Sequence, residues 1–343
     1  MISVAHLLDD FGMGGVTRAL TLFDDPRLSA IANSRIVPVG PEAKFAPSLD
    51  ADLIVDHMAL SWKRLAFLAS LRLRNPRARI VHVEHSYTRA FEEDNVASPR
   101  RFRKMLRLAS LLVDQFICVS NAQRDWLTEE VGISAAKLQT IYPWSGRFEL
   151  GDVPAQKPRG DRPLRLLAYG RFSTVKNFDA LVRAMRPFAV QDVELTLFGD
   201  GPDRALLSQL AASLTHVKIE GATNDISAHL EDCDAVIIPS RNEAFGLVAT
   251  EARLAGRAII VADVDGLPEQ VGSAGMTTPL KHPGDISAAI RWALRAPLEV
   301  MGEAGRGEVA SQHDEIIERW ISVFREVEDL RGGDISPPQT MAA

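Results

Sequence analysis

Short apolar runs alternate with longer stretches of helical periodicity along nearly the whole chain, and this alternation limits the possible folds more than any other feature. It is the pattern of βα units, in which each strand joins a parallel sheet and each helix covers a face of that sheet. The runs predicted to be strands are 2–8, 35–39, 52–56, 79–84, 115–120, 164–169, 194–198, 217–220, 235–238 and 258–262. The stretches predicted to be helices are 15–23, 61–73, 100–112, 121–130, 178–190, 204–214, 245–255 and 285–294. The sequence therefore predicts an α/β fold built on doubly wound parallel sheets.

The alternation is interrupted over residues 151–163, where three prolines and two glycines break every period. Such a segment is typical of a linker. We therefore expect two Rossmann-like domains, 1–155 and 160–312, that face a central cleft at the carboxyl ends of their strands, where ligands bind to such sheets. Residues 313–330 predict a helix that packs back across the domains, and residues 331–343 predict a flexible tail.

The composition excludes several classes of protein. The chain has 343 residues, 46% of them hydrophobic, and its 39 basic and 45 acidic residues give a net charge of −6. This balance is typical of a soluble globular protein and unlike a nucleic-acid binder, so no nucleic-acid partner is predicted. Cys118 and Cys233 lie in apolar runs without zinc-site spacing, which predicts buried thiols. Residues 1–10 show neither a basic leader nor a signal-length apolar stretch, so we expect a cytoplasmic protein without a spanning helix.

The strongest local signal runs from Asp234 to Glu251. A predicted strand ends near Pro239, a loop carries Glu243, and a helix begins near Phe245. The first amides of a helix are unpaired and lie at the positive end of its dipole, so they can bind an anion. The amides predicted to do so are those of Phe245, Gly246, Leu247 and Val248. Two carboxylates beside an anion site favour a hydroxyl-rich ligand that carries phosphate, such as a sugar nucleotide; a helix-end charge and a solvated helix residue are the alternatives for the two glutamates.

Several blocks carry a family resemblance. They are Gly14-Gly15-Val16-Thr17-Arg18, Tyr169-Gly170-Arg171-Phe172 with Lys176-Asn177, Phe198-Gly199-Asp200-Gly201-Pro202, Glu220-Gly221-Ala222, and residues 239–247 with Glu251. Their order and spacing resemble those of GT-B fold glycosyltransferases, specifically the retaining enzymes of family 4, or group 1. The resemblance covers nearly the whole chain. It implies the GT-B architecture, with an N-terminal domain that binds the acceptor and a C-terminal domain that binds the nucleotide-sugar donor.

The implied donor site consists of glycine turns, the first turn of a helix and one carboxylate. The residues expected to bind the donor are Gly14, Gly15, Gly170, Gly199, Gly201, Gly221, Ala222, Phe245, Gly246, Leu247, Val248 and Glu251, the last on the ribose. Gly14 and Gly15 follow the first strand and precede a helix, as a backbone cradle for phosphate does. They lack the spacing of a G-x-G-x-x-G motif, which weighs against a nicotinamide-dependent dehydrogenase.

Four residues are expected to act at the reacting centre: His85, Arg171, Lys176 and Glu243. Arg171 and Lys176 follow the first strand of the second half, where cations can neutralise a diphosphate leaving group. Glu243 would hold hydroxyls of the donor sugar. His85 follows a strand and is similar to a cleft histidine of the family; surface charges and a packed histidine are the alternatives. The residues predicted to contact the acceptor are Glu84, Ser86 and Tyr87.

The resemblance implies a hexosyltransferase that uses a nucleoside diphosphate sugar, linked to UDP or GDP, and a saccharide or lipid-linked acceptor. It places such an enzyme in the biosynthesis of cell-surface polysaccharide, including exopolysaccharide and lipopolysaccharide, or of glycolipid. A sugar-nucleotide epimerase or hydrolase of the same fold is one alternative. A catalytically silent scaffold that binds sugar nucleotides is the other.

Two Asp-x-Asp triplets, at residues 232–234 and 263–265, are candidates for a metal site. In another glycosyltransferase architecture such a triplet holds a divalent metal against the diphosphate. Asp234 directly precedes a predicted buried strand, which favours a role at strand entry, and the second triplet resembles a loop of the family. We therefore predict no metal site and no obligate cofactor.

Basic residues are concentrated in the first half. Residues 98–107 contain five basic residues and no acidic one, with Phe102, Met105 and Leu106 at helical spacing. A second set consists of Lys63, Arg64, Arg72, Arg74, Arg77 and Arg79. Against a net charge of −6, this concentration favours peripheral docking at the anionic inner face of the membrane. Solvated helix faces are the alternative.

Overall fold

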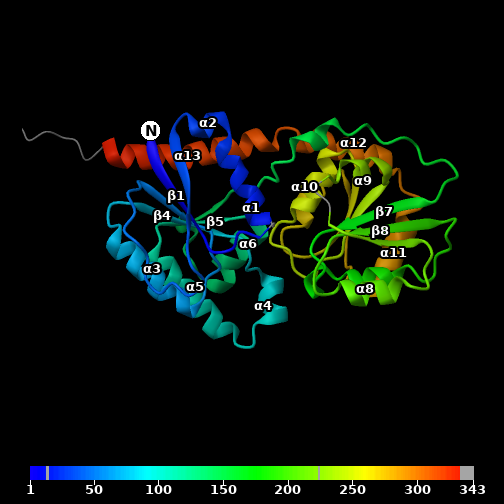
Figure 1. Ribbon diagram of the computed structural model, residues 1–343, viewed down its shortest axis with the longest axis horizontal. Helices are drawn as coiled ribbons and strands as arrows, with labels where there is room; N and C mark the ends of the chain where they lie inside the picture. The colour runs from blue at the N-terminus through cyan, green and yellow to red at the C-terminus, as the bar shows by residue number, and fades with distance from the viewer. Residues whose placement is uncertain (13–14, 223–224, 333–343) are drawn as a thin grey trace, which may run out of the picture.

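The computed structural model describes residues 1–12, 15–222 and 225–332, and its strands form two six-stranded sheets (Figure 1). The first sheet has the order β2-β1-β3-β4-β5-β6 and the second the order β12-β11-β10-β7-β8-β9, and all paired strands run parallel. The first sheet consists of β1 (Ile2–Leu8), β2 (Ala32–Pro38), β3 (Leu53–Asp56), β4 (Arg79–Glu84), β5 (Gln115–Cys118) and β6 (Leu138–Thr140). The second consists of β7 (Leu164–Tyr169), β8 (Val193–Phe198), β9 (Val217–Glu220), β10 (Ala235–Ile238), β11 (Ala258–Ala262) and β12 (Gly275–Thr278). The predicted α/β fold with two doubly wound parallel sheets is confirmed.

Helices connect the strands and cover both sheets. In the first half they are α1 (Gly15–Ala19), α2 (Pro26–Ser29), α3 (Trp62–Arg74), α4 (Arg89–Asn95), α5 (Pro99–Leu112) and α6 (Asn121–Trp126). In the second half they are α7 (Phe178–Ala184), α8 (Arg204–Ala211), α9 (Ser227–Asp232), α10 (Leu247–Leu254), α11 (Pro283–Ala293) and α12 (Leu298–Val309), followed by α13 (Gln312–Gly332). The sequence did not predict β6, β12, α2, α4, α9 or α12. β6 is three residues long and β12 is Gly-Met-Thr-Thr, so neither presents the apolar run that predicts a strand.

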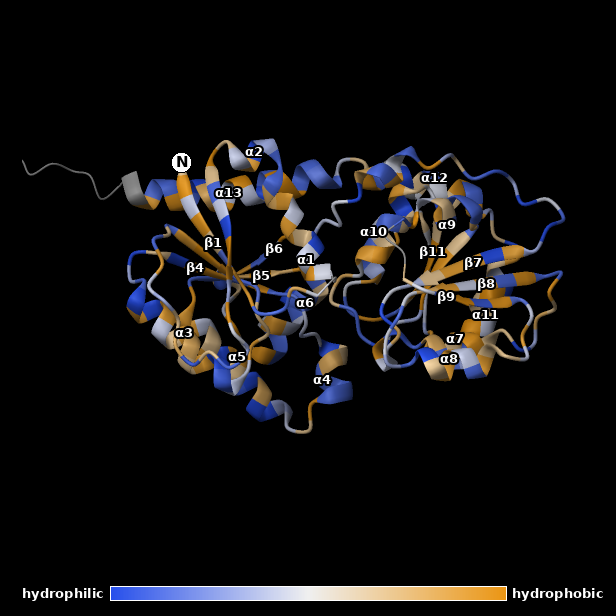
Figure 2. Ribbon diagram, in the orientation of Figure 1, coloured by the Kyte–Doolittle hydropathy of each residue, from blue (hydrophilic) through white to orange (hydrophobic). Residues whose placement is uncertain are grey.

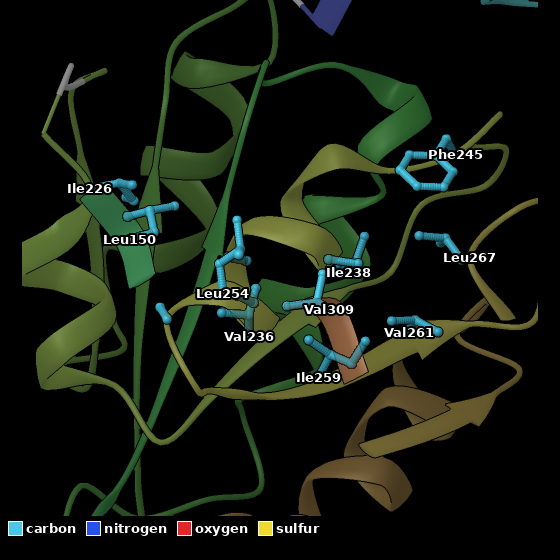
Figure 3. Close-up of a cluster of buried hydrophobic side chains, with 14 of the residues drawn as sticks. Leu150, Ile226, Val236, Ile238, Phe245, Leu254, Ile259, Val261, Leu267 and Val309 are labelled. Atoms are coloured by element: carbon cyan, nitrogen blue, oxygen red, sulfur yellow. The ribbon is translucent and has the colours of Figure 1, made fainter. Parts of the chain in front are cut away.

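The strands form the core of each half, and Figure 2 shows them as largely hydrophobic ribbons between more polar helices. β3, β10 and β11 are buried along their full length, because helices cover both faces of a parallel sheet. Figure 3 shows Val236 of β10, Ile259 of β11, Leu254 of α10 and Val309 of α12 within one buried cluster. The two cysteines are buried free thiols, as predicted.

The helix α13 returns from the second half to the first (Figure 1). Trp320 packs edge-on against Phe23, with ring centroids 4.9 Å apart, and Arg79 Nη2 lies 2.7 Å from Glu326 Oε2. The preceding helix α12 packs on β11 of the second sheet. The chain therefore passes between the halves twice, at residues 151–163 and again between α12 and α13. Across the described ranges, none of the helices combines the length and hydrophobicity needed to span a membrane.

Candidate functional site

The N-terminus of α10 follows the loop that leaves the carboxyl end of β10. Gly246 caps this helix with a φ of +88°, which glycine adopts without strain. The helix begins at Leu247, two residues later than predicted, because Phe245 is buried and stacks on Tyr142 with ring centroids 5.1 Å apart. The predicted helix start is corrected accordingly. The anion contact predicted for the amides of Phe245 and Gly246 stays a prediction, since neither amide donates a hydrogen bond among the described residues. In the described part of the chain the amides of Leu247 and Val248 donate to no other group, so both remain available to an anion.

Lys176 and Glu243, both predicted to be catalytic, form an ion pair beside this helix end. Lys176 Nζ contacts Glu243 Oε2, and Ser240 Oγ donates to the same oxygen over 3.0 Å. The two charged side chains are 24% and 16% exposed, so they are reachable from the solvent. Lys176 ends a short turn after β7, whereas Glu243 belongs to the loop after β10, and these strands are neighbours in the sheet. Sheet topology thus brings together a cation and a carboxylate that lie far apart in the sequence.

Glu251 lies one turn into α10 and is fully buried. Tyr169 donates from its hydroxyl to Glu251 Oε2 over 2.8 Å, and Glu251 Oε1 lies 3.3 Å from Arg18 Nη1 and 3.5 Å from Arg147 Nε. Burial raises the pKa of this carboxyl, while Arg147, Tyr169 and Arg18 act in the opposite direction. A solvated helix residue, the alternative considered from sequence, is therefore excluded by the position of Glu251. The sequence did not single out Arg147, Tyr169 or Arg18 as its partners.

The glycine turns at the ends of β7 and β8 pack backbone against backbone. A Cβ on Gly199 would lie 1.9 Å from the carbonyl oxygen of Gly170, and one on Gly201 would lie 2.3 Å from that of Phe172. The φ angles of Gly170, Gly199 and Gly201 are +139°, +148° and +153°. Phe172 N also donates to the carbonyl of Asp200 over 2.8 Å, which extends the pairing of the strands into the loops. These glycines therefore set the course of the loops at the carboxyl edge of the second sheet, where a ligand can approach the backbone.

The remaining residues of the predicted donor site lie on other loops and elements. Arg171 is exposed and has no ion-pair partner among the described residues. Gly221 and Ala222 are exposed at the end of β9, the edge strand of the second sheet. Gly15 begins α1 in the first half, and a Cβ there would lie 3.5 Å from Leu247 Cδ1. The start of α1 is thus close to the start of α10 in the other half; Gly14 lies outside the described residues.

Asp265 links a loop of the second half to a loop of the first half. Its carboxylate accepts hydrogen bonds from Thr88 Oγ1 over 2.8 Å and from the amide of Ala90 over 3.1 Å, both in the first half. It also accepts from the amide of Glu243 over 3.0 Å in its own half. The loop that follows His85 is therefore tied, through one carboxylate, to the loop that carries Glu243. The sequence placed Asp265 in a family loop and did not predict this bridge.

Glu269 forms a second link between the halves. Its carboxylate accepts from the amides of Asn121 and Ala122, over 2.9 Å and 2.6 Å, at the start of α6. The hydroxyl of Tyr142 donates to it over 2.8 Å. A carboxylate at a helix N-terminus is favoured by the helix dipole. Asp265 and Glu269 together hold the second half against the first.

His85 follows β4, as expected, and contacts another histidine. Its Nε2 lies 3.0 Å from Nδ1 of His57, and Nε2 of His57 lies 3.0 Å from Nδ1 of His6. Burial lowers the pKa of His85 to about 4. The sequence predicted His85 and did not single out His57 or His6, although all three occur in or just after a strand, and the strands concerned, β1, β3 and β4, are adjacent in the sheet.

Glu84 does not lie where an acceptor could reach it. It is 1% exposed, and its Oε1 accepts from the amides of Ser86 and Tyr87 over 2.9 Å and 3.0 Å. Its Oε2 lies 3.4 Å from His82 Nε2. Glu84 therefore shapes the turn after β4, which corrects the predicted acceptor contact. Ser86 is exposed on this turn, and Tyr87 is half-buried, with its hydroxyl donating to the carbonyl of Leu60 over 2.5 Å.

The first Asp-x-Asp triplet lies at a strand entry, as its sequence context indicated. Asp234 is buried and lies 2.7 Å from Arg162 Nη2, and it accepts from the amide of Arg165 over 2.9 Å. These contacts fix the start of β10 against β7. Within residues 1–12, 15–222 and 225–332, no group of three or more His, Cys, Asp or Glu side chains is placed to hold a metal ion.

Sequence comparisons match both halves to related families. Residues 34–144 match the family described as Glycosyltransferase Family 4, and residues 163–296 match the family described as Glycosyl transferases group 1. The chain is 25% identical to the MMP alpha-(1->4)-mannosyltransferase of Mycolicibacterium hassiacum over 276 residues, which cover 75% of this chain and 66% of that protein. It is 27% identical to the D-inositol 3-phosphate glycosyltransferase of Saccharomonospora viridis over 290 residues, which cover 76% of this chain and 66% of that protein. The chain thus spans just under two thirds of the length of these curated relatives.

Structural comparisons extend over almost the whole chain. HepE from Anabaena, solved in complex with UDP and glucose, superposes with a TM-score of 0.74 and 18% identity and covers 95% of this chain and 100% of HepE. Sucrose-phosphate synthase from Thermosynechococcus elongatus superposes with a TM-score of 0.74 and 19% identity, covering 96% and 100% of the two chains. At this identity the likeness shows the shared GT-B fold.

Proposed function

The chain belongs to the group 1 and family 4 glycosyltransferases, and we propose that it transfers a hexosyl unit from a UDP- or GDP-linked sugar to a saccharide or lipid-linked acceptor with retention of configuration. The family membership confirms the resemblance predicted from the sequence. The observation that carries the proposal is the ion pair of Lys176 and Glu243 beside the free amides of α10. This arrangement offers cationic and N–H donors to a diphosphate and a carboxylate to sugar hydroxyls within one cleft.

Each charged group of the site has a role in the proposed reaction. The diphosphate binds at the start of α10, where Lys176 and the unpaired Arg171 neutralise the charge that develops on it. Glu243, released from Lys176 when the phosphate binds, accepts hydrogen bonds from hydroxyls of the donor sugar. Glu251 is buried beneath Arg18 and Arg147, and it accepts hydrogen bonds from the ribose when the side chain of Arg18, which is 38% exposed, turns away from its Oε1. The UDP and glucose bound to HepE support this class of donor.

The proposed transfer is a front-face displacement. The acceptor oxygen forms a bond to the anomeric carbon on the side from which the diphosphate oxygen leaves, and the acceptor proton passes to that departing oxygen. Retention of configuration follows, because attack and departure occur on one face. The bridges through Asp265 and Glu269 hold the halves together around the reacting centre, which excludes water and thereby hydrolysis of the donor.

Calorimetric titration with UDP-, GDP- and ADP-sugars tests the donor site directly. We expect one nucleotide to bind selectively and Glu251→Gln to weaken its binding. Glu318→Gln is the matched control, because Glu318 is exposed on α13 and has no ion pair in the described part of the chain. Absence of binding across the panel would contradict the proposal. Donor hydrolysis or epimerisation without an acceptor would favour the alternative enzyme class, and binding without turnover would favour a silent scaffold.

We also propose that the first half docks on the anionic cytoplasmic face of a membrane, where a lipid-linked acceptor would be found. α3 and α5 lie side by side, and the guanidinium of Arg101 lies over the Trp62 ring, 5.6 Å from its centroid. Exposed hydrophobic side chains accompany exposed basic ones on these two helices and beside them. The exposed residues are Trp62, Lys63, Leu73, Arg74, Arg77, Arg100, Arg101, Lys104, Leu108 and Leu111. This mixture of apolar and cationic side chains suits an anionic lipid surface.

Some of the basic residues predicted to dock on the membrane are paired within the protein, so the proposed docking surface excludes them. Arg64 is buried and paired with Asp9 over 2.5 Å, Arg72 lies 2.6 Å from Asp114, and Arg103 lies 2.7 Å from Glu92. Vesicles with 30% anionic lipid should pellet the protein at low salt. The triple variant R100Q/R101Q/K104Q should stay in the supernatant. The variant K281Q/R295Q/R325Q removes the same charge from exposed sites elsewhere and should still pellet; equal behaviour of the two variants would contradict docking through α5.

A further inference from the structure

Three histidines from neighbouring strands form a hydrogen-bonded chain inside the first half. His6 belongs to β1, His57 follows β3, and His85 follows β4, and these strands are adjacent in the sheet. His6 Nδ1 lies 3.0 Å from His57 Nε2, and His57 Nδ1 lies 3.0 Å from His85 Nε2. Consecutive rings are stacked with centroids 5.3 Å apart. The chain therefore leads from the core at His6 to the cleft loop at His85.

The inner end of this chain of histidines determines which nitrogen donates in each of its hydrogen bonds. His6 is 1% exposed, and its Nε2 is buried without a hydrogen-bond partner among the described residues. A neutral imidazole carries one N–H and one lone pair, and a buried unpaired N–H is rarer in proteins than a buried unpaired acceptor. The lone pair of His6 therefore belongs on Nε2 and its proton on Nδ1. His6 then donates to His57, His57 donates from Nδ1 to His85 Nε2, and the last proton lies on Nδ1 of His85.

The outer end of the chain is open. His85 Nδ1 has no partner in the described part of the chain, yet it is not among the buried unpaired atoms, so solvent reaches it. The residues that follow His85 are bridged through Asp265 to the amide of Glu243. The free N–H thus lies on a first-half loop that contacts, through Asp265, the loop carrying Glu243 of the Lys176–Glu243 pair.

The surrounding groups keep the three rings neutral. Burial lowers the pKa of His6 to about 3 and that of His85 to about 4, and it holds the pKa of His57 well below its ordinary value. The charged groups next to the chain are Asp56, His82 and Glu84. Burial alone would lower the pKa of His82, but its hydrogen bonds to Asp56 and Glu84 raise it to about 9. The positive charge therefore stays on His82, where it opposes protonation of His57. At His85, burial is the largest effect and lowers the pKa, Glu84 acts to raise it, and His82 acts to lower it.

We propose that His57 and His6 are positioning residues that hold the proton of His85 on Nδ1, so that His85 presents a hydrogen-bond donor to a sugar hydroxyl in the cleft. The proposal rests on the proposed function, because that function supplies the sugar. The ring nitrogen that carries the proton is set by the hydrogen bond of the other nitrogen. Without His57, the His85 proton could occupy either nitrogen. For part of the time Nδ1 would then be unprotonated and could not donate a hydrogen bond to the sugar hydroxyl.

Histidine NMR of the full-length protein tests the direction of the chain. In protein labelled with 15N-histidine, long-range 1H–15N correlations distinguish a protonated ring nitrogen from a bare one. At neutral pH we expect His6, His57 and His85 each to carry a proton on Nδ1 and none on Nε2. A proton on Nε2 of His85 would overturn the proposal. This readout needs no turnover, so a failure of the proposed function, seen as absent nucleotide-sugar binding, is distinguishable from a failure of the inference.

Two substitutions of His57 separate positioning from packing. His57→Phe keeps a ring in the core but removes the donor, and we expect it to abolish the fixed Nδ1 state of His85 and to lower kcat about tenfold with KM for the donor little changed. His57→Gln can donate from its amide to His85 Nε2 and should restore both the Nδ1 state and most of kcat. The control is His216→Gln, which alters a buried histidine of the second half. Equal kinetics in the two His57 variants would overturn the positioning role, and if His57→Phe does not fold, the wild-type spectrum and His57→Gln decide.

Discussion

The two halves of the molecule share a doubly wound parallel fold but form their sides of the cleft from different groups. In the second half the loops at the strand ends are shaped by main chain, since Gly170, Gly199 and Gly201 allow carbonyls and amides to meet without side chains between them. In the first half the corresponding positions are occupied by buried titratable side chains, among them His57 and Glu84. A site made of backbone tolerates almost no added atom, whereas a site made of ionisable side chains responds to proton transfer. The second half should therefore be sensitive mainly to added side-chain atoms, and the first half mainly to changes in pH.

The largest effect is expected from an added methyl group in the second half. In Gly199→Ala the new Cβ would lie 1.9 Å from a backbone oxygen, at a φ of +148°. The clash cannot be relieved by a rotamer change, so we expect the free energy of unfolding to fall by at least about 3 kcal/mol. Urea denaturation measures the change. Among the described residues, the new Cβ of Gly15→Ala in the first half would meet only Leu247 Cδ1, at 3.5 Å, so stability should change by less than about 1 kcal/mol. Equal losses in the two variants would show that the backbone-lined loops of the second half are no more sensitive to an added methyl group than the first half.

The next effect concerns the reaction itself. Lys176→Met should lower the rate of sugar transfer about 10²- to 10³-fold, because it removes a cation from the developing charge of the leaving diphosphate. Stability should change little, since the Lys176–Glu243 pair is partly exposed and such pairs contribute little. Initial-rate kinetics with the donor identified by calorimetry provide the measurement. Lys281→Met, at an exposed lysine outside the cleft, is the control, and similar rates in both variants would contradict the role of Lys176.

The first half should give the molecule its pH dependence. The folded-state pKa of His82 is raised to about 9, so its contribution to stability is complete below the unfolded value of about 6.5 and is lost as pH rises through 9. The lowered pKa values of His6 and His85 reduce stability at low pH. Below pH 6.5 these two histidines bind protons in the unfolded chain but stay neutral in the folded protein, which favours unfolding. Stability should therefore be greatest near pH 6.5.

Thermal unfolding across pH 5–9.5 measures this profile. We expect the wild-type protein to lose about 1–3 kcal/mol between pH 6.5 and 9.5, and His82→Gln to lose this decline. His216→Gln, in the second half, should keep it. A flat wild-type profile above pH 6.5 would show that Asp56 and Glu84 do not hold a proton on His82.

The same contrast explains which parts of the site the sequence could predict. The positions of Lys176, Glu243 and the glycine turns follow from residues that lie at strand ends, and a strand end is visible as the point where an apolar run stops. Glu251 was assigned to the cleft, but its burial against Tyr169 depends on helix rotation, which periodicity does not define closely. The start of α10 at Leu247 instead of Phe245 was also not predictable from periodicity, because it depends on the stacking of Phe245 on Tyr142 of the other half.

The first-half wall was harder to predict because it depends on the order of strands in the sheet. His6, His57 and His85 meet only because β1, β3 and β4 are neighbours, and the chain order β1, β2, β3 does not show that β2 is an edge strand. Glu84 was predicted at the acceptor because it adjoins His85, yet alternation along β4 turns it inward toward His82. Contacts between the halves, such as those of Asp265, depend on how the two sheets are placed relative to each other. The spacing of residues along the sequence does not reveal them.

The smallest effect is expected where the two walls meet. Asp265 has a φ of +46°, which asparagine tolerates, so Asp265→Asn keeps the backbone while replacing charge-assisted hydrogen bonds to Thr88 and Ala90 with neutral ones. We expect the closed arrangement to lose about 1 kcal/mol and the Kd for the donor sugar nucleotide to rise about fivefold, with the unfolding free energy of the chain nearly unchanged. Calorimetry measures the Kd. Asp263→Asn, two residues earlier in the same loop, should leave the Kd within twofold of the wild-type value, because its carboxylate makes no hydrogen bond to the first half among the described residues. If Asp265→Asn binds the donor as tightly as the wild type, the bridge through Asp265 does not set the distance between the two halves, and the contacts of Glu269 and α13 are enough to hold them together.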